Sequence, residues 1–294
     1  MKLLEEIQAM RTEPGELMIC WLGQAGVCLK DAEGRIVYVD PYFTNCGERM
    51  RGFKRLSPQL IDPTEVTAAY YITTHTHFDH FDFDGIPQVA ANNPAMKFIG
   101  PGSCMEELRK LNIGEDRCVQ LDRGETYENE GIRIHALWAD HGTMAPDAIG
   151  ILLEMEGHRI YFSGDTAFHE ELFRQVGETY QPEVAFMSIN GQFGNMTGEE
   201  GARAAELCGA RYGVPCHIWT FMEHRGDPYT FCGALETSGS CKARCFSQGE
   251  IQVLKSSNEL MEMKKEIIAY ESYPLYAAGS HRVFLYSRAA GKRQ

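Results

Sequence analysis

Short runs of apolar residues alternate with amphipathic segments along the chain, and polar turns separate them. The short runs are typical of β-strands, and they cover residues 17–23, 25–30, 35–40, 70–74, 97–100, 118–121, 126–128, 132–137, 150–155, 159–163, 184–189 and 214–219. Helices are predicted in the first dozen residues, from near Phe81, and over residues 103–111, 171–176 and 197–208. Ser103 with Glu106, and Thr197 with Glu200, have the spacing of capping boxes.

These strands and helices follow one another in two successive blocks, without a linker or a short repeat. The order predicts two sheets packed face to face with helices outside, although the pattern alone allows either an α/β or an α+β fold. Residues 47–63 lack periodicity and are interpreted as a flap. After residue 228 we predict a loop over 237–241, a short helix over 259–266 and a last strand over 283–286.

The composition is that of a globular protein with a sizeable core, because 44% of the 294 residues are hydrophobic and 23% are charged. We predict one domain over residues 1–294, although the length also allows two small domains. The chain has no apolar run of about 18 residues and no signal-peptide pattern, so we predict a cytoplasmic protein without a membrane partner. The ten cysteines form no C-x-x-C pair and are interpreted as reduced thiols, with a metal or redox role for Cys241 and Cys245 as the weaker alternative.

The net charge of −13 and the isoelectric point of about 5.3 argue against nucleic acid as a partner. They leave room for a small anionic substrate, since a few local cations or bound metal ions can hold one anionic group. We therefore expect a small-molecule partner.

A dense group of potential metal ligands follows the predicted strand over residues 70–74. His75 and His77 are two residues apart, so both imidazoles can point to the same side, and Asp79 and His80 follow in a tight loop. A polar surface loop is the alternative interpretation. It is the weaker one, because apolar strand residues deliver the cluster and such crowded groups need a cation between them.

The H-x-H-x-D-H pattern of residues 75–80 resembles the signature of the metallo-β-lactamase superfamily, and matching segments follow in order. His141 comes after a predicted strand, Asp165 lies in Tyr-Phe-Ser-Gly-Asp-Thr, and His217 ends Val-Pro-Cys-His. Asp40 matches the early aspartate that supports the metal loop in that family. The resemblance implies an α+β fold, an αββα four-layer sandwich of two mixed sheets.

It also implies a site for one or two divalent ions, zinc or manganese, with iron as a further alternative. One ion would be held by His75, His77 and His141, and the other by Asp79, His80 and His217, with Asp165 as the bridge. A site with a single metal ion that uses part of this set stays open.

Further segments, among them Trp-Leu-Gly-Gln-Ala-Gly at residues 21–26, resemble the branch that contains L-ascorbate-6-phosphate lactonase. The branch implies a homo-oligomer and hydrolysis of a small lactone or ester, such as a phosphorylated sugar lactone, by a metal-activated water. Asp79 is then the candidate that carries a proton to the leaving group, although it can equally be a pure ligand.

Substrate contacts are predicted at Asn190, which follows a strand, and at His224 and Arg225, which could clamp a phosphate or carboxylate. The flap adds a group of cations that could cover the pocket or be solvated only: Arg49, Arg51, Lys54 and Arg55.

Three other functions compete with the lactonase prediction. A phosphodiesterase with the same dinuclear site is the first, and a metal-binding regulatory protein without turnover is another. A di-iron oxidoreductase is disfavoured because relatives of that kind replace the second histidine of the signature, whereas His77 is present here.

Overall fold

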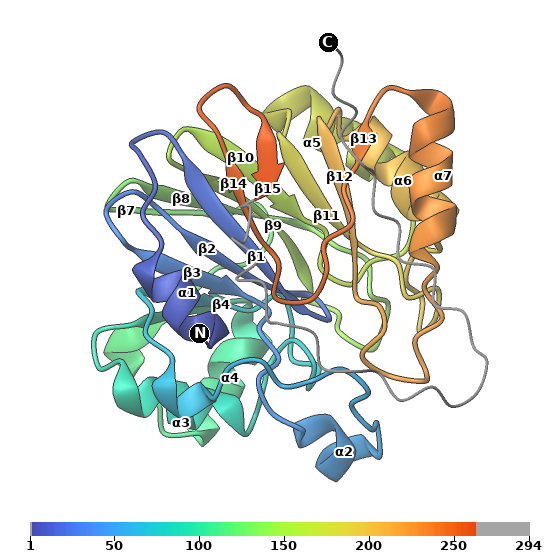
Figure 1. Ribbon diagram of the computed structural model, residues 1–294. Coiled ribbons are helices and arrows are strands. Elements are labelled where there is room, and N and C mark those ends of the chain that lie inside the picture. Colours follow the sequence, from blue (N-terminus) through green and yellow to red (C-terminus); the bar gives the residue numbers. More distant parts are fainter. Residues whose placement is uncertain (1, 263–294) are drawn as a thin grey trace, which may run out of the picture. The chain divides into compact units, whose positions relative to one another are not determined.

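Two β-sheets pack face to face in the computed structural model of the protein, which describes residues 2–262 (Figure 1). The strands of the first sheet lie in the order β15 (Leu260–Glu262), β14 (Ile251–Leu254), β1 (Leu17–Gly23), β2 (Gly26–Lys30), β3 (Ile36–Val39), β4 (Tyr70–Ile72), β5 (Lys97–Gly100) and β6 (Cys118–Gln120). Those of the second sheet lie in the order β13 (Lys242–Ala243), β12 (Tyr212–Cys216), β11 (Val184–Ser188), β10 (His158–Phe162), β9 (Ile149–Met155), β8 (Ile132–Trp138) and β7 (Thr126–Asn129).

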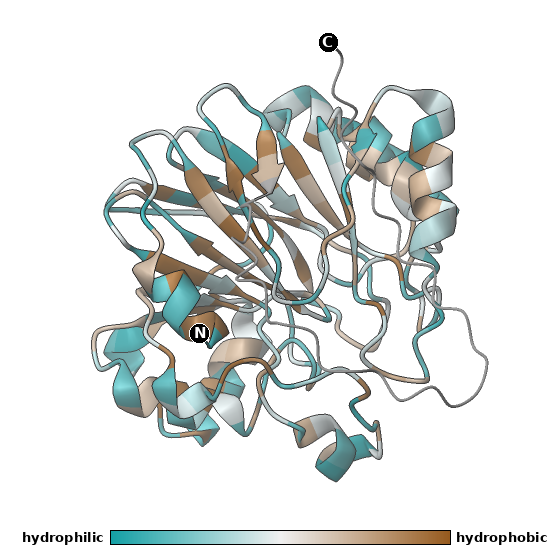
Figure 2. Cartoon of the chain, viewed as in Figure 1, coloured by the Kyte–Doolittle hydropathy of each residue, from teal (hydrophilic) through white to brown (hydrophobic). Residues whose placement is uncertain are grey.

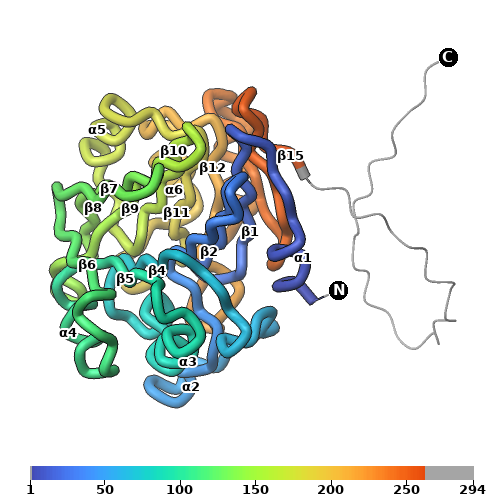
Figure 3. The backbone as a smooth tube through the Cα atoms, turned by 90° about the vertical axis from the view of Figure 1, so that its left-hand side faces the viewer, coloured from blue at the N-terminus to red at the C-terminus, as the bar shows by residue number. Residues whose placement is uncertain are grey.

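Helices cover the outer faces of both sheets (Figure 3). The helices are α1 (Leu3–Ala9), α2 (Cys46–Arg51), α3 (Gly85–Asn92), α4 (Gly102–Lys110), α5 (Glu170–Tyr180), α6 (Gly198–Leu207) and α7 (Pro228–Ser238), with 3-10 turns η1 (Pro63–Glu65) and η2 (Glu115–Arg117). Helices α1, α3 and α4 pack on the first sheet, and α5, α6 and α7 share a hydrophobic cluster with the second. The predicted αββα sandwich is confirmed.

Strand β1 shows why the sheets are layered in this way. Leu17 and Ile19 belong to the core between the two sheets, whereas Met18 and Cys20 belong to the core beneath the outer helices. Successive strand residues point to opposite faces, so a strand that is buried on both faces is apolar throughout. Figure 2 shows this as brown segments along the central strands, interrupted by pale and teal ones, and as mixed colour on the helices.

The direction of the strands decides where the connecting loops meet. Strands β3 to β6 run parallel to one another in the first sheet, and β10 to β13 run parallel in the second. Strand β8 has the same direction as β10, because both are antiparallel to β9. Loops at the carboxyl ends of such strands gather at one edge, which is where open α/β sheets bind their ligands.

Several predicted elements differ from the structure. The helix expected near Phe81 begins at Gly85, since residues 76–81 form turns. Helix α4 is present, but the Ser103 hydroxyl bonds to Asp147 instead of capping it. The Thr197 capping box is confirmed by its reciprocal bonds with Glu200.

Beyond residue 228 the prediction was weakest. Helix α7 was not predicted, and the helix expected over 259–266 is wrong where the structure describes it, because Leu260–Glu262 pairs with β14 as a strand. The strand predicted over 283–286 lies outside the described residues. The described residues belong to one compact unit, Met1–Met263, so a single domain over the whole chain stays a prediction. None of the helices within residues 2–262 has the length and apolarity needed to cross a bilayer.

Lys30 joins helix α1 to the first sheet. Its side chain is 4% exposed, and its ammonium donates to the carbonyls of Ile7, Gln8 and Met10 at 2.9, 2.7 and 3.0 Å. These carbonyls belong to the end of α1, where helical partners are lacking. Burial lowers the pKa of Lys30.

We expect Lys30→Met to lower the free energy of unfolding by about 1–2 kcal/mol, because it keeps the chain length and removes charged hydrogen bonds. Urea denaturation measures this change. Lys54→Met is the control, since Lys54 is exposed, and an equal effect of the two substitutions would contradict the role of Lys30.

Candidate metal centre

The loop that follows β4 is fixed from behind by Asp40. This buried carboxylate accepts hydrogen bonds from Thr74 N at 2.8 Å, from Thr74 Oγ1 at 2.7 Å and from His80 Nδ1 at 2.7 Å. The Thr74 hydroxyl gives its hydrogen to Asp40, so its 3.0 Å contact with His75 Nδ1 requires the proton on that nitrogen. Both His75 and His80 therefore carry a proton on Nδ1, which leaves Nε2 as the nitrogen that can bind a metal ion.

The second sheet brings the other ligand candidates to the same place. His141 follows β8, Asp165 comes three residues after β10, and His217 directly follows β12. The backbone N–H of His217 donates to the carbonyl of Gln24 at 2.8 Å, across from the first sheet. All three side chains are buried.

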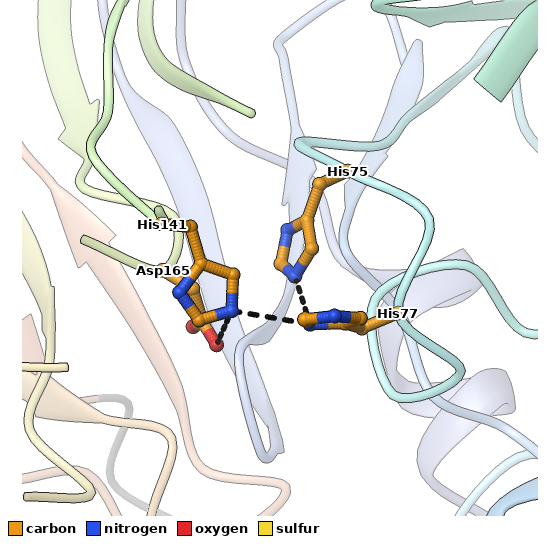
Figure 4. A group of neighbouring side chains, drawn as sticks. All are labelled: His75, His77, His141 and Asp165. Atoms are coloured by element: carbon orange, nitrogen blue, oxygen red, sulfur yellow. Dashed lines mark hydrogen bonds and ion pairs between the residues drawn. The ribbon is translucent and has the colours of Figure 1, made fainter. Parts of the chain in front are cut away.

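The nitrogens of His75, His77 and His141 converge on one point (Figure 4). His77 Nδ1 lies 2.9 Å from His75 Nε2 and 3.2 Å from His141 Nε2. Asp165 Oδ2 is 3.6 Å from His141 Nε2. These four residues can each offer one ligand atom, with all four atoms within 4.8 Å of one another.

A second group lies on the other side of Asp165. His80 Nε2 is 3.0 Å from His217 Nε2, and Asp165 Oδ1 lies 3.3 Å from His80 and 3.4 Å from His217. Asp79 Oδ2 is 3.0 Å from His217 Nε2. Asp165 thus has one oxygen toward each group, and its buried Oδ1 has no hydrogen-bond partner.

The electrostatics of these residues fit divalent cations. Burial lowers the pKa values of His75, His77 and His141, so these imidazoles are neutral, as ligands must be. Burial opposes charge on His80 too, yet the carboxylates of Asp165, Asp40 and Asp79 raise its pKa well above the ordinary value. These carboxylates place negative charge beside imidazole nitrogens that face one another. Such a set of nitrogen and oxygen ligands suits ions such as zinc, manganese or iron.

A pocket of about 330 Å³ opens on this cluster. It is lined by Arg51, Phe53, His77, Phe78, Asp79, His141, Met144, Asp165, Asn190, Phe193, His217 and His224. Part of the pocket wall is aromatic, since the lining residue Phe53 packs against both Phe78 and Phe193. Asn190 is fully buried, and neither its Oδ1 nor its Nδ2 has a partner.

The structure brings His224 to the pocket but not Arg225. The His224 ring stacks on His217 with 4.5 Å between centroids, and burial lowers the pKa of His224 to about 3. Arg225 is exposed and lines a separate pocket with Thr197 and Asp227. The expectation that Arg225 clamps an anion at the metal cluster is therefore corrected. His224 and Arg225 are consecutive in the loop, yet they line different pockets.

Arg51, at the end of α2, is the arginine that lines the metal pocket. The other flap cations are used elsewhere or stay in solvent. Arg49 forms an ion pair with Asp84 at 2.6 Å, Arg55 donates to the carbonyls of Tyr42 and Thr44, and Lys54 is exposed. The flap thus supplies one cation to the pocket.

Sequence reasoning gave no role to Gln24, in the turn between β1 and β2. Its Nε2 lies 2.7 Å from Asp79 Oδ2 and 3.2 Å from His224 Nδ1. The structure shows Gln24 as a buried residue with a positive φ of 55°. Its partners lie 55 and 200 residues away in the sequence, so local patterns could not reveal them.

Residues 35–218 match the family model described as a beta-lactamase superfamily domain. An Aeropyrum pernix protein named as a UPF0173 metal-dependent hydrolase is 31% identical over 234 residues, covering 74% of this chain and 89% of that protein. A probable L-ascorbate-6-phosphate lactonase, UlaG, from Salmonella heidelberg is 27% identical over 275 residues, covering 77% and 76%.

The fold comparison agrees. The structure of Igni18, a metallo hydrolase from the archaeon Ignicoccus hospitalis, aligns with a TM-score of 0.66 and 23% identity, covering 82% of this chain and 99% of Igni18. The family match spans β3 to the residue after His217 and so includes the strand ends that carry the cluster. The chain therefore belongs to the metallo-β-lactamase superfamily of metal-dependent hydrolases, in the branch similar to the L-ascorbate-6-phosphate lactonases.

Proposed function

We propose that the protein uses a dinuclear metal site to open a small lactone or ester that carries an anionic group, such as a phosphorylated sugar lactone. The observation that carries the proposal is the pocket, which is lined by the histidine–aspartate cluster, by three phenylalanines and, among its arginines and lysines, by Arg51 alone. The likeness to the Salmonella lactonase supports the choice of substrate class.

In this proposal, His75, His77 and His141 hold one ion and His80, His217 and Asp79 hold the other, with Asp165 between them. Asp165 is suited to bridging because its two oxygens face different groups of nitrogens. When bound, divalent ions supply Lewis acidity, which polarises a carbonyl group and makes water a stronger acid.

Asp79 is the residue that we propose moves the proton. Burial alone would raise its pKa, but the neighbouring His80 and His217 lower it below the ordinary range, and bound cations would act in the same direction. Asp79 is thus an ionised carboxylate that lines the pocket, able to accept a proton from the attacking water and pass it to the leaving oxygen.

The remaining pocket residues bind and orient the substrate. The aromatic wall of Phe53, Phe78 and Phe193 excludes water from one face of a small ring. The free amide of Asn190 can donate to a ring oxygen or accept from a hydroxyl, which would satisfy its buried polar atoms. Arg51 lies where it can pair with a phosphate or carboxylate arm.

Exchange of His77 or Asp165 for Ala is expected to remove most bound metal, measured by mass spectrometry of metal content, together with turnover. It should also lower the melting temperature in the presence of zinc by about 5–10 °C, because a ligand at 100 times its Kd stabilises by about 2.7 kcal/mol. His135→Ala is the control, since His135 on β8 pairs with Glu154 on β9, outside the cluster. Full metal content in both variants would refute the ligand set.

Among four probes, we expect the wild-type enzyme loaded with Zn²⁺ or Mn²⁺ to prefer phosphorylated lactones. The probes are L-ascorbate 6-phosphate, 6-phosphoglucono-δ-lactone, glucono-δ-lactone and bis(4-nitrophenyl) phosphate. The kcat/KM for at least one phosphorylated lactone should exceed that for the phosphodiester by about tenfold or more, a difference of about 1.4 kcal/mol. Turnover of the phosphodiester alone would replace the lactonase proposal with a phosphodiesterase.

Arg51→Met is expected to raise KM for 6-phosphoglucono-δ-lactone by about tenfold and to leave KM for glucono-δ-lactone nearly unchanged. The effect should shrink at high salt, because Arg51 is exposed and its charge is screened. Arg49→Met, on the same helix but paired with Asp84, and Arg225→Met, at the separate pocket, are matched controls. Equal changes for both lactones would remove Arg51 from anion recognition.

A further inference from the structure

The side-chain amide of Gln24 stands between Asp79 and His224. Its Nε2 lies 2.7 Å from Asp79 Oδ2 and 3.2 Å from His224 Nδ1. The orientation of the amide follows from this geometry, because a carboxylate oxygen of Asp79 accepts a hydrogen bond from Nε2 and would repel Oε1 in the same place. The nitrogen carries two hydrogens, so it can donate to both partners.

This arrangement determines the tautomer of His224. The amide nitrogen of Gln24 can only donate, so His224 Nδ1 must be the acceptor and carry no proton. The ring is then the neutral imidazole with its proton on Nε2. Asp40 and Thr74 place a proton on Nδ1 of His80 and of His75. The amide of Gln24 instead leaves Nδ1 of His224 without a proton, so that Nε2 carries it.

The ring has little freedom to turn away from this position. It stacks on His217 at an interplanar angle of 22° and meets the Phe221 ring edge-on at 90°, with 5.2 Å between centroids. The His224 backbone N–H donates to the carbonyl of Phe221 at 3.2 Å. Within residues 2–262, Nε2 of His224 has no hydrogen-bond partner. The atom is not buried, so it is open to the pocket that the ring lines.

We infer that Gln24 is a positioning residue that holds His224 as the Nε2–H tautomer, and that His224 donates a hydrogen bond from Nε2 to the oxygen that becomes negative as the substrate carbonyl is attacked. The donor role rests on the proposed function, because it requires a carbonyl substrate in this pocket. No proton is transferred. A neutral imidazole N–H stabilises the developing charge without losing its hydrogen, and it is pre-aimed at no cost during the reaction.

A competing role for His224 is metal binding, since Asp79, His217 and His224 could together surround an ion. The hydrogen bond from Gln24 argues against it. With Nδ1 accepting and Nε2 protonated, neither nitrogen has a free lone pair for a metal. His224 could become a ligand only by giving up the bond to Gln24, and metal content separates the two roles.

Three substitutions of His224 test the donor role, with the zinc-loaded enzyme and 6-phosphoglucono-δ-lactone as the probe. His224→Ala and His224→Asn should lower kcat by about 10²–10³-fold with small changes in KM and metal content, as for the loss of an oxyanion donor. His224→Gln should recover about tenfold or more over His224→Ala, because the longer amide reaches the position of Nε2, whereas that of Asn reaches only Nδ1. Equal loss in all three variants, or a loss of zinc in His224→Ala, would overturn the donor role.

The positioning role has a readout that does not need turnover. In ¹⁵N-labelled zinc-loaded protein, the ring nitrogens of His224, identified by their loss in His224→Gln, should show a protonated Nε2 and an unprotonated Nδ1. Gln24→Met should weaken this preference and lower kcat while zinc content is kept. Gln88→Met is the control, since the Gln88 amide donates to the Asp84 carbonyl within the α3 region and does not line the pocket. A protonated Nδ1, or shifts of a metal-bound ring, would refute the inference. If the wild type opens no lactone, the proposed function fails together with the donor role. The ¹⁵N measurement of the His224 tautomer still tests whether Gln24 positions His224.

Discussion

The buried carboxylate of Asp40 is the interaction on which the site depends. It ties the end of β3 to the loop after β4 through three hydrogen bonds of 2.7 to 2.8 Å. Its own backbone has a φ of 45°, a conformation that costs a non-glycine residue roughly 1 kcal/mol or more and that the three bonds hold in place. The same carboxylate determines, directly for His80 and through Thr74 for His75, that Nδ1 carries a proton. Asp40 therefore determines both where these imidazoles lie and which nitrogen can bind a metal ion.

Both sheets contribute residues to the cluster, and backbone hydrogen bonds between the sheets hold the two sets of residues in place relative to each other. His75, His77, Asp79 and His80 come from the first sheet, and His141, Asp165 and His217 come from the second. The carbonyl of Thr74 accepts from Ile149 N at 3.1 Å, and that of Gln24 accepts from His217 N at 2.8 Å. Gly164 allows the close approach, since a Cβ there would lie 3.2 Å from Thr74 Cβ of the first sheet. Relative sliding of the sheets would therefore separate both groups of nitrogens at once.

The parts that could be predicted are those in which a short stretch of sequence determines the geometry. The spacing of residues 75–80 after an apolar strand placed four side chains together, and the strand-end positions of His141, Asp165 and His217 followed from the family resemblance. Arg225 was misplaced because His224 and Arg225 line different pockets, and the spacing of the two residues from His217 cannot tell which of them faces the cluster. Arg51 could be predicted only as one of four flap cations, and Gln24 could not be predicted, because their roles depend on contacts between distant segments. Strand β15 depends on pairing with β14 in the same way.

The charge distribution around the pocket has a consequence for selectivity. The whole chain carries a net charge of −13, so its long-range field repels an anionic substrate. At physiological salt that field decays within about 8 Å, and the substrate is left with what it touches in the pocket. There, Arg51 is the one arginine or lysine among the lining residues, while Asn190 and His224 are neutral donors. In the proposed function, recognition of an anionic arm would therefore be separated from stabilisation of the reacting oxygen: the first would be electrostatic and sensitive to salt, and the second would rely on neutral groups.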